Sequence, residues 1–181
     1  IIEGLYNISG IISTSGKALE WAKAAGGYTH ISYEELFSEI EHAKPGADRL
    51  VFLPYLAGER APIWDPSARG AFIGLALRHG RREMLRAVVE SVGFAIRHVI
   101  TVMEEMGLSV NDLRVTGSQA KSSCWNQIKA DITGKKIVVP VMKYSELAGD
   151  LAIASCGIGK YATLVEAAEN SLRIEREYLP V

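Results

Sequence analysis

The sequence predicts an α/β fold in one domain that spans residues 1–181. Short apolar runs of strand length alternate along the chain with longer stretches in which apolar residues recur at helical spacing. Hydrophobic residues make up 48% of the chain and charged residues 23%, which is enough apolar material for one substantial core. No internal repeat, low-complexity segment or convincing linker interrupts the alternation. Together these observations favour a single α/β domain.

The composition argues against several function classes. A formal net charge of -1 provides no basic surface for nucleic acid and no polybasic patch for a membrane. The sequence as it stands shows no signal-peptide pattern and no apolar run long enough to cross a bilayer. Cys124 and Cys156 lie in apolar helical stretches, which favours buried free thiols and a reducing cytoplasm. The chain opens without Met in a strand-like run, so we expect a fragment of a longer protein.

The first elements are a predicted strand, Ile1–Asn7, and a helix over Ile8–Ala25 that is interrupted near Ser13–Gly16. Gly16 and Lys17 superficially match a phosphate-binding P-loop. The match fails because five residues rather than four separate Gly10 from Gly16. It also fails because Ala18 stands where the motif needs the hydroxyl that binds Mg²⁺. Two alternative roles remain for Gly16. It allows a close approach of the backbone, or it is a small residue at a packed helix contact.

A capping box predicts the next helix, with Ser32 as N-cap, Glu35 three residues later and an end near Ala43. Leu50–Pro54 and Ala71–Leu75 are predicted strands on either side of a long loop. Long ordered loops are often functional. The alternative that we favour is an internal ion-pair and packing system that pins the loop, formed by Glu59, Arg60, Trp64, Asp65 and Arg69.

The longest helix is predicted over Arg81–Met106, because its apolar residues recur three and four positions apart and Gly107 follows it. We expect the apolar stripe to be core. The charged residues are expected on the outer face: Arg82, Glu83, Arg86 and Arg97. The four histidines lack metal-ligand spacing and are expected at the surface or behind functional residues: His30, His42, His79 and His98.

Leu113–Gly134 is the most informative stretch, because it reads as strand, glycine turn, helix and helix-stopping glycine. Gly117 allows a sharp turn and a close approach of backbone to a ligand. Ser122 or Ser123 can cap the helix, whose first N–H groups attract phosphate or the polar atoms of a nucleotide. The plain alternative is a βα unit with a serine cap, since short glycine turns are weak motifs.

The C-terminal part begins with a predicted strand at Lys136–Pro140. The helix over Glu146–Gly157 is rich in alanine and glycine, which suits tight packing or a ligand pressed against it. Thr163 and Glu166 predict a further capping box. Arg173–Val181 is a charged tail, with a strand as the alternative.

A longer motif in the middle of the chain resembles the FGGY family of carbohydrate kinases. Residues 52–75 read FLPYLAGERAPIWDPSARGAFIGL, and EMLRAVVE follows after seven residues. The C-terminal signature of that family asks for two glycines around an apolar residue, then a polar–apolar pair, a small residue, two apolar residues and an acid. The positions that match are Gly70, Phe72, Gly74, Leu75, Glu83, Met84, Ala87, Val88, Val89 and Glu90. The resemblance covers nearly the whole chain.

The resemblance implies an actin-like, ribonuclease-H-like domain, with a mixed sheet flanked by helices. It implies that this chain is the C-terminal, nucleotide-binding domain of a two-domain sugar kinase that uses ATP and Mg²⁺. The sugar would bind mostly to the N-terminal domain, and the aspartate that acts as general base would lie upstream of Ile1, so no catalytic residue and no metal ligand is assigned here. If the domain begins upstream, its first strands are missing and the strand at Ile1–Tyr6 has a free edge, which makes a homodimer an alternative.

Five positions of this sequence match the nucleotide-binding positions of the family: Gly16, Glu20, Gly117, Ser118 and Ser122. The family usually has a second glycine where this chain has Ser118, and a left-handed backbone there would cost serine about 1–2 kcal/mol.

The motif around the long loop is closer to xylulose and gluconate kinase-like members than to glycerol kinases. Besides the kinase, two alternatives are a divergent, non-catalytic nucleotide-binding or scaffold module of the same fold, and an unrelated α/β binding domain.

Overall fold

The computed structural model describes residues 6–181. Of the strand predicted at Ile1–Asn7, the first five residues lie outside the described residues, and Tyr6 and Asn7 are not in a strand. The elements in chain order are α1 Gly16–Ala25, α2 Tyr33–Glu41, η1 Ala47–Arg49, β1 Val51–Leu53, β2 Ala71–Ile73, α3 Arg81–Glu105, β3 Asp112–Arg114, η2 Ser118–Lys121, α4 Ser123–Thr133, β4 Lys136–Pro140, α5 Ser145–Gly157, α6 Leu164–Ser171 and β5 Ile174–Tyr178.

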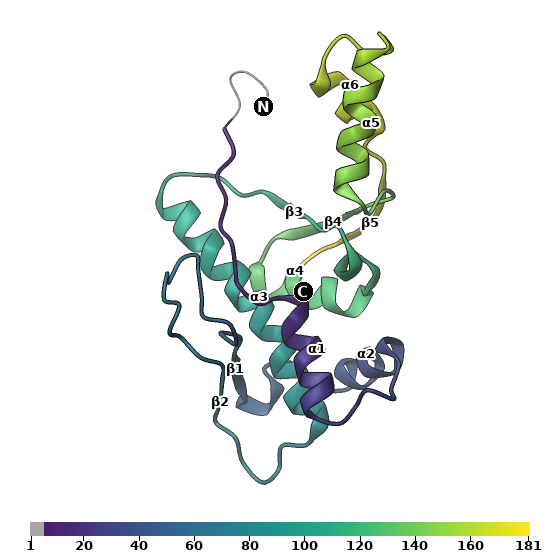
Figure 1. Cartoon of the computed structure of the whole chain (residues 1–181). Helices are drawn as coiled ribbons and strands as arrows, with labels where there is room; N and C mark the ends of the chain where they lie inside the picture. The colour runs from purple at the N-terminus through teal and green to yellow at the C-terminus, as the bar shows by residue number, and fades with distance from the viewer. Residues whose placement is uncertain (1–5) are drawn as a thin grey trace.

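A mixed sheet has the strand order β3-β4-β5 (Figure 1). β3 runs parallel to β4, with Leu113 opposite Ile137, as expected when a helix such as α4 connects the two strands. β5 is antiparallel to β4, so the charged tail is a strand. A separate antiparallel pair joins β1 to β2. The combination of mixed sheet and helices agrees with the predicted α/β class.

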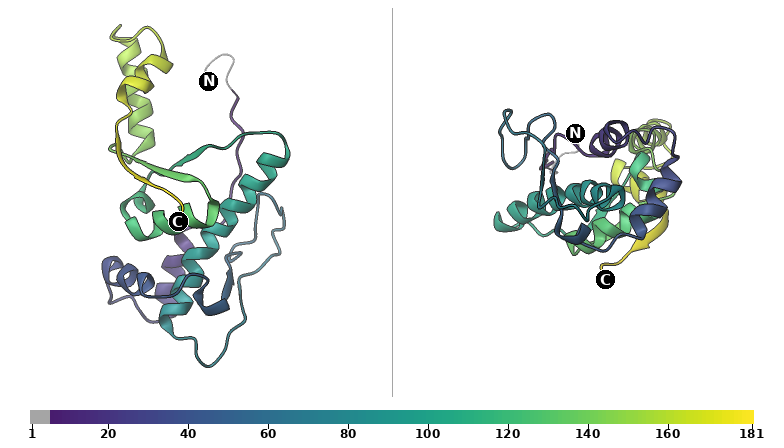
Figure 2. Two further views of the ribbon diagram at one scale, coloured as in Figure 1. Left: turned by 180° about the vertical axis from the view of Figure 1, so that it is seen from behind. Right: turned by 90° about the horizontal axis from the view of Figure 1, so that it is seen from below.

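α3 is the central helix, and α1, α2, α4 and β1 all contact it (Figures 1 and 2). Its inner face buries Leu85, Val88, Val89 and Val92 almost completely. Each such side chain contributes about 1.5–3 kcal/mol when it leaves water. α5 and α6 contact each other and extend away from α3 beyond the sheet (Figure 1). Among the described residues, no helix combines the length and the apolar character that crossing a bilayer requires.

The helix predicted over Ile8–Ala25 is wrong in its first half, because regular helix begins only at Gly16. The preceding segment is held by the long loop instead. Ile11 accepts a hydrogen bond from the backbone N–H of Ala61 (2.9 Å), and the N–H of Ser13 donates to the Glu59 carboxylate (2.7 Å). These contacts with the loop take the place of helical hydrogen bonds.

The long loop is pinned by hydrogen bonds, and the predicted ion-pair and packing system is wrong. Glu59 is buried, and its N–H donates to the carbonyl of Asp65 (2.8 Å). Arg69 donates to two loop carbonyls rather than to a carboxylate. Within residues 6–181, none of the ion pairs involves the five predicted residues, and Trp64 is exposed.

Helix ends follow the predicted local chemistry. The Ser32 hydroxyl and the Glu35 carboxylate form the complete capping box of α2. Gly134 ends α4 in the left-handed conformation, with φ of 64°. At α6 the box is partial, because the Thr163 hydroxyl accepts from the N–H of Glu166 while the Glu166 carboxylate accepts from Ala162.

Arg86 does not lie on the outer face. It is buried and pairs with Glu90 at 2.6 Å, and the same carboxylate accepts a hydrogen bond from the N–H of Gly46 at 2.9 Å. A buried arginine needs such a partner, because an isolated charge in the interior is very costly. The last acid of the family-like signature therefore ties α3 to the turn before β1.

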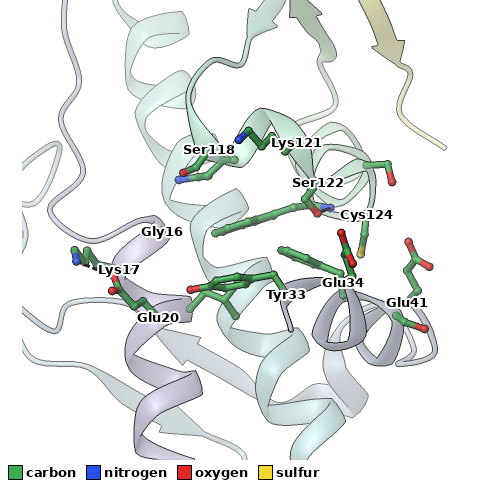
Figure 3. A pocket seen from close by; sticks show the side chains of 16 residues that line it. Gly16, Lys17, Glu20, Tyr33, Glu34, Glu41, Ser118, Lys121, Ser122 and Cys124 are labelled. Carbon is green, nitrogen blue, oxygen red and sulfur yellow. Dashed lines mark hydrogen bonds and ion pairs between the residues drawn. The ribbon is translucent and has the colours of Figure 1, made fainter. Parts of the chain in front are cut away.

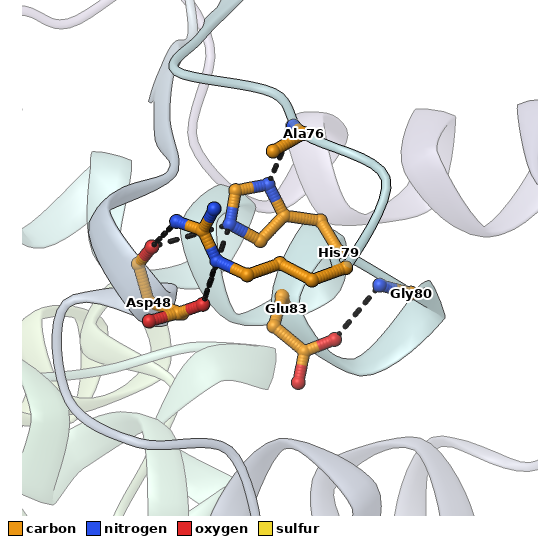
Figure 4. A network of polar contacts seen from close by, with 6 residues as sticks. Asp48, Ala76, His79, Gly80 and Glu83 are labelled. Carbon is orange, nitrogen blue, oxygen red and sulfur yellow. Dashed lines mark hydrogen bonds and ion pairs between the residues drawn. The ribbon is translucent and has the colours of Figure 1, made fainter.

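That turn has a left-handed backbone, with positive φ at Gly46, Ala47, Asp48 and Arg49. The Arg78 guanidinium, in the segment before α3, pairs with the Asp48 carboxylate and so holds the pKa of that carboxyl below its usual value. Figure 4 shows His79 of the same segment beside Asp48. The imidazole of His79, whose side chain is fully buried, lies 3.1 Å from the Asp48 carbonyl, while its Nδ1 accepts from the N–H of Ala76. His79 is therefore a packing residue and not a surface histidine.

We predict that Glu90→Ala lowers the free energy of unfolding by about 3–5 kcal/mol, because it leaves Arg86 buried without its partner. Urea titration measures this. Glu177→Ala, which removes an exposed pair with Lys136, is the control and should cost much less. Equal losses in the two variants would contradict the assignment of Glu90 as a buried anchor.

Candidate functional site

A pocket of about 810 Å³ opens between α1, α2 and the start of α4 (Figure 3). It brings together residues of α1 and α2, which are neighbours in sequence, and of the segment Ser118–Trp125, which is far from both in sequence. The residues that line it are Gly16, Lys17, Leu19, Glu20, Tyr33, Glu34, Phe37, Ser38, Glu41, Ser118, Gln119, Lys121, Ser122, Ser123, Cys124 and Trp125. Four of the five predicted site residues are in this set, and the fifth, Gly117, directly precedes Ser118.

α1 supplies one wall through its first two turns. Gly16 is the first residue of the helix, and the exposed side chains of Lys17 and Glu20 pair at 2.7 Å. Leu19 on the same helix is buried against the core, which fixes the direction of the wall. The N-cap residue, Ser15, makes no side-chain capping bond, and its carbonyl accepts from the N–H of Ala18 at 3.0 Å, so the N–H groups of Gly16 and Lys17 are left without a side-chain cap at the pocket.

The turn after β3 supplies the opposite wall, and Gly117 determines its shape. Its φ of 73° lies in the region that glycine adopts without strain and other residues rarely adopt. There is room for a side chain at this position, because an added Cβ would meet no atom within 4 Å. The backbone conformation, rather than lack of space, therefore requires glycine. The N–H of Gly117 donates to the Lys143 carbonyl at 2.6 Å, which fixes the turn against the chain after β4.

Ser118 starts η2 and is not among the residues with positive φ. The cost that a left-handed serine would carry therefore does not arise. The N-cap of α4 is Ser122, whose hydroxyl accepts from the N–H of Trp125 at 3.2 Å, and not Ser123. The buried side-chain amide of Asn126 donates to the Ala120 carbonyl and locks the turn onto α4.

α2 forms a third wall that sequence reasoning missed. Tyr33, Glu34, Phe37, Ser38 and Glu41 all line the pocket from this helix. Tyr33 and Phe37 are four residues apart and so lie on one face of a helix, which is the one signal that the sequence offered. Nothing in the local pattern indicates that this face meets α4, where the Phe37 and Trp125 rings lie 5.8 Å apart.

The hydrogen bond with the Glu20 carboxylate raises the pKa of Lys17 at the pocket, and burial shifts the pKa values of Cys124 in the pocket and of Lys129 in a neighbouring cavity. Burial raises the pKa of the Cys124 thiol to about 12, which makes it a poor nucleophile. Cys124 is a buried free thiol as predicted, whereas Cys156 is only partly buried. A second cavity of about 280 Å³ lies beside the turn and is lined by Lys129 and Gln119 among others. Burial lowers the pKa of Lys129 to about 8.

The family model for the C-terminal domain of the FGGY family of carbohydrate kinases matches residues 1–157. This chain belongs to the FGGY family. The matching region includes α1, the long loop, α3, the glycine turn, α4 and α5. The signature residues that suggested the family, Gly70–Glu90, run from the residue before β2, through the segment that holds the left-handed turn, into the first half of α3.

Relatives with known names agree with this membership. The chain is 31% identical to a xylulose kinase of Staphylococcus epidermidis, over 97% of this chain and 35% of that protein. It is 35% identical to a gluconokinase of Bacillus licheniformis, over 90% of this chain and 33% of that protein. The chain thus spans about a third of the length of these FGGY kinases.

Solved structures agree as well. A ligand-bound xylulose kinase from Lactobacillus acidophilus superposes with a TM-score of 0.85 at 29% identity, over 95% of this chain and 35% of that chain. A gluconate kinase from the same organism gives the same values. The actin-like, ribonuclease-H-like class implied by the resemblance is therefore confirmed for this FGGY domain.

We predict that Cys124 resists alkylation by iodoacetamide at pH 8 in the folded protein. With a pKa of about 12, only about one thiol in ten thousand is ionised at that pH. Mass spectrometry should find Cys156 modified first and Cys124 modified only after addition of urea. Modification of Cys124 at the rate seen in urea would contradict its burial.

Proposed function

We propose that this chain is the ATP-binding half of a carbohydrate kinase, which transfers the γ-phosphate of ATP to a hydroxyl of a sugar or sugar acid. The observation that carries the proposal is the convergence of Gly16, Glu20, Ser118 and Ser122 on one pocket, with Gly117 directly beside it. Residues 100 or so positions apart in the chain are brought to one site, as a ligand site requires and a plain βα unit does not.

The pocket suits a nucleotide in size and chemistry. A volume of about 810 Å³ lies within the usual range of ligand pockets. The N-terminal ends of α1 and α4 carry partial positive charge, and at α1 the N–H groups of Gly16 and Lys17 have no side-chain cap, which favours phosphate. We assign the phosphate end to Gly16 and the backbone at Ser118, and the adenosine end to Ser122. The ring faces of Tyr33 and Phe37 provide apolar surface for a base.

We assign neither a metal ligand nor the general base to residues of this chain. Within residues 6–181, no group of three or more His, Cys, Asp or Glu side chains is placed to hold a metal ion. Mg²⁺ would accompany ATP and neutralise charge on its phosphates, while this chain positions the nucleotide. We place the sugar and the aspartate base on an N-terminal kinase domain, and we expect residues 1–181 alone to be inactive. A cytoplasmic location and a homodimer remain predictions.

A non-catalytic nucleotide-binding module of the same fold is the second candidate. It is favoured by Ser118, which stands where the family usually has a second glycine, and by the added bulk of Gln119 beside it. The coding sequence upstream of Ile1 discriminates between the two, because a kinase needs an aspartate in the junction between its domains. Absence of that aspartate would remove the kinase proposal and leave the module.

We predict that the full-length protein binds ADP saturably and that Gly117→Ala weakens binding about ten-fold or more, because alanine at positive φ costs about 1–2 kcal/mol and shifts the turn. Isothermal titration calorimetry measures the affinity. Gly107→Ala is the matched control, since Gly107 has φ of 85° and equally free space but ends α3 far from the pocket. Equal affinities for the Gly117 and Gly107 variants would place the nucleotide elsewhere.

A further inference from the structure

We propose that Gln119 is a positioning residue of the nucleotide pocket, which clasps the turn at residues 118–121 to the start of α1. The inference rests on the proposed function and extends it to a residue outside the five family positions. Gln119 lines both the main pocket and the smaller cavity.

The contact itself is direct. The side-chain Nε2 of Gln119 donates to the hydroxyl of Ser15 at 2.6 Å, across 104 positions of sequence. The same nitrogen lies 3.4 Å from where a Cβ at Gly16 would stand. The amide therefore reaches the first turn of α1, and a larger residue at position 16 would press on it.

The clasp also changes how α1 begins. Ser15 is the N-cap residue, where a serine hydroxyl ordinarily accepts a hydrogen bond from an N–H of the first turn. Here the hydroxyl accepts from Gln119 and makes no capping bond, and Ser15 has φ of -126° and ψ of -100°. The N–H of Ala18 donates to the Ser15 carbonyl at 3.0 Å, whereas the N–H groups of Gly16 and Lys17 have no side-chain cap and keep their capacity to donate to an anion in the pocket.

The α1 wall and the wall formed by the turn and α4 rest on the same helix, α3, but need a further contact at the mouth of the pocket. α1 and α4 both pack on α3, which fixes their bases. At the rim, Asn126 locks the Ala120 carbonyl onto α4, so the turn moves with that helix. Gln119 then sets the spacing between the turn and α1, on which a ligand that touches both walls depends.

This arrangement distinguishes two ligands. ADP spans the adenosine end and the phosphate end, so it uses both walls and their spacing. Adenosine lacks phosphates and uses the turn and α4 without the start of α1. Loss of the clasp should therefore weaken ADP but leave adenosine unchanged, which a general loss of fold would not do.

The test is a double-mutant cycle on the full-length protein, with Gln119→Ala, Ser15→Ala and the double variant. Losing one hydrogen bond should weaken ADP binding about three- to ten-fold in each single variant. The double variant should be no weaker than either single variant, because the two side chains act through one contact. Adenosine affinity should stay within about two-fold in all three.

Two further variants sharpen the result. Gln119→Leu keeps the side-chain volume without the donor and should behave as Gln119→Ala does. Gln127→Ala removes an amide on the outer side of α4, where it contacts Asp131 and the Leu179 carbonyl, and should leave ADP binding unchanged.

Additive losses in the double variant, or an equal loss of adenosine affinity, would overturn the clasp while leaving the nucleotide site in place. A wild-type protein that binds neither ligand would overturn the proposed function and the clasp with it.

Discussion

Burial of the inner face of α3 is the constraint on which the rest of the structure depends. Leu85, Val88 and Val89 of that face are almost fully buried. α1, α2 and α4 all pack on this helix, so the three walls of the pocket are held by one support. One charged pair of α3 serves the same end, because Arg86 and Glu90 are buried and anchor the turn before β1.

The pocket depends next on backbone conformation at the end of β3. Gly117 turns the chain with φ of 73°, and the following residues return at once to a 3-10 helix that leads into α4. Ser118 therefore occupies an ordinary conformation although it replaces a usual glycine of the family. The departure changes the side chain at the pocket and leaves the path of the backbone intact.

Sequence alone predicted the features that local chemistry determines. The Ser32 capping box, the left-handed Gly134 and the long helix through α3 follow from capping and helical spacing. Sequence alone failed where contacts between residues far apart in the chain determine the structure. The segment before Gly16 is not helical because the long loop takes its hydrogen bonds, and Arg86 is buried because Glu90, which also accepts from Gly46, pairs with it. For the same reason the α2 wall and the contact of Gln119 with Ser15 were invisible, since each joins parts of the chain far apart in sequence.

The central claim is that a nucleotide lies between α1, α2 and the start of α4 with its phosphates at the first turn of α1. A crystal structure of the full-length protein with ADP tests this most directly. The account predicts phosphate oxygens within hydrogen-bonding distance of backbone N–H groups at Gly16 or Ser118, and the adenosine beside Ser122. Nucleotide bound at another surface, with this pocket empty, would contradict it.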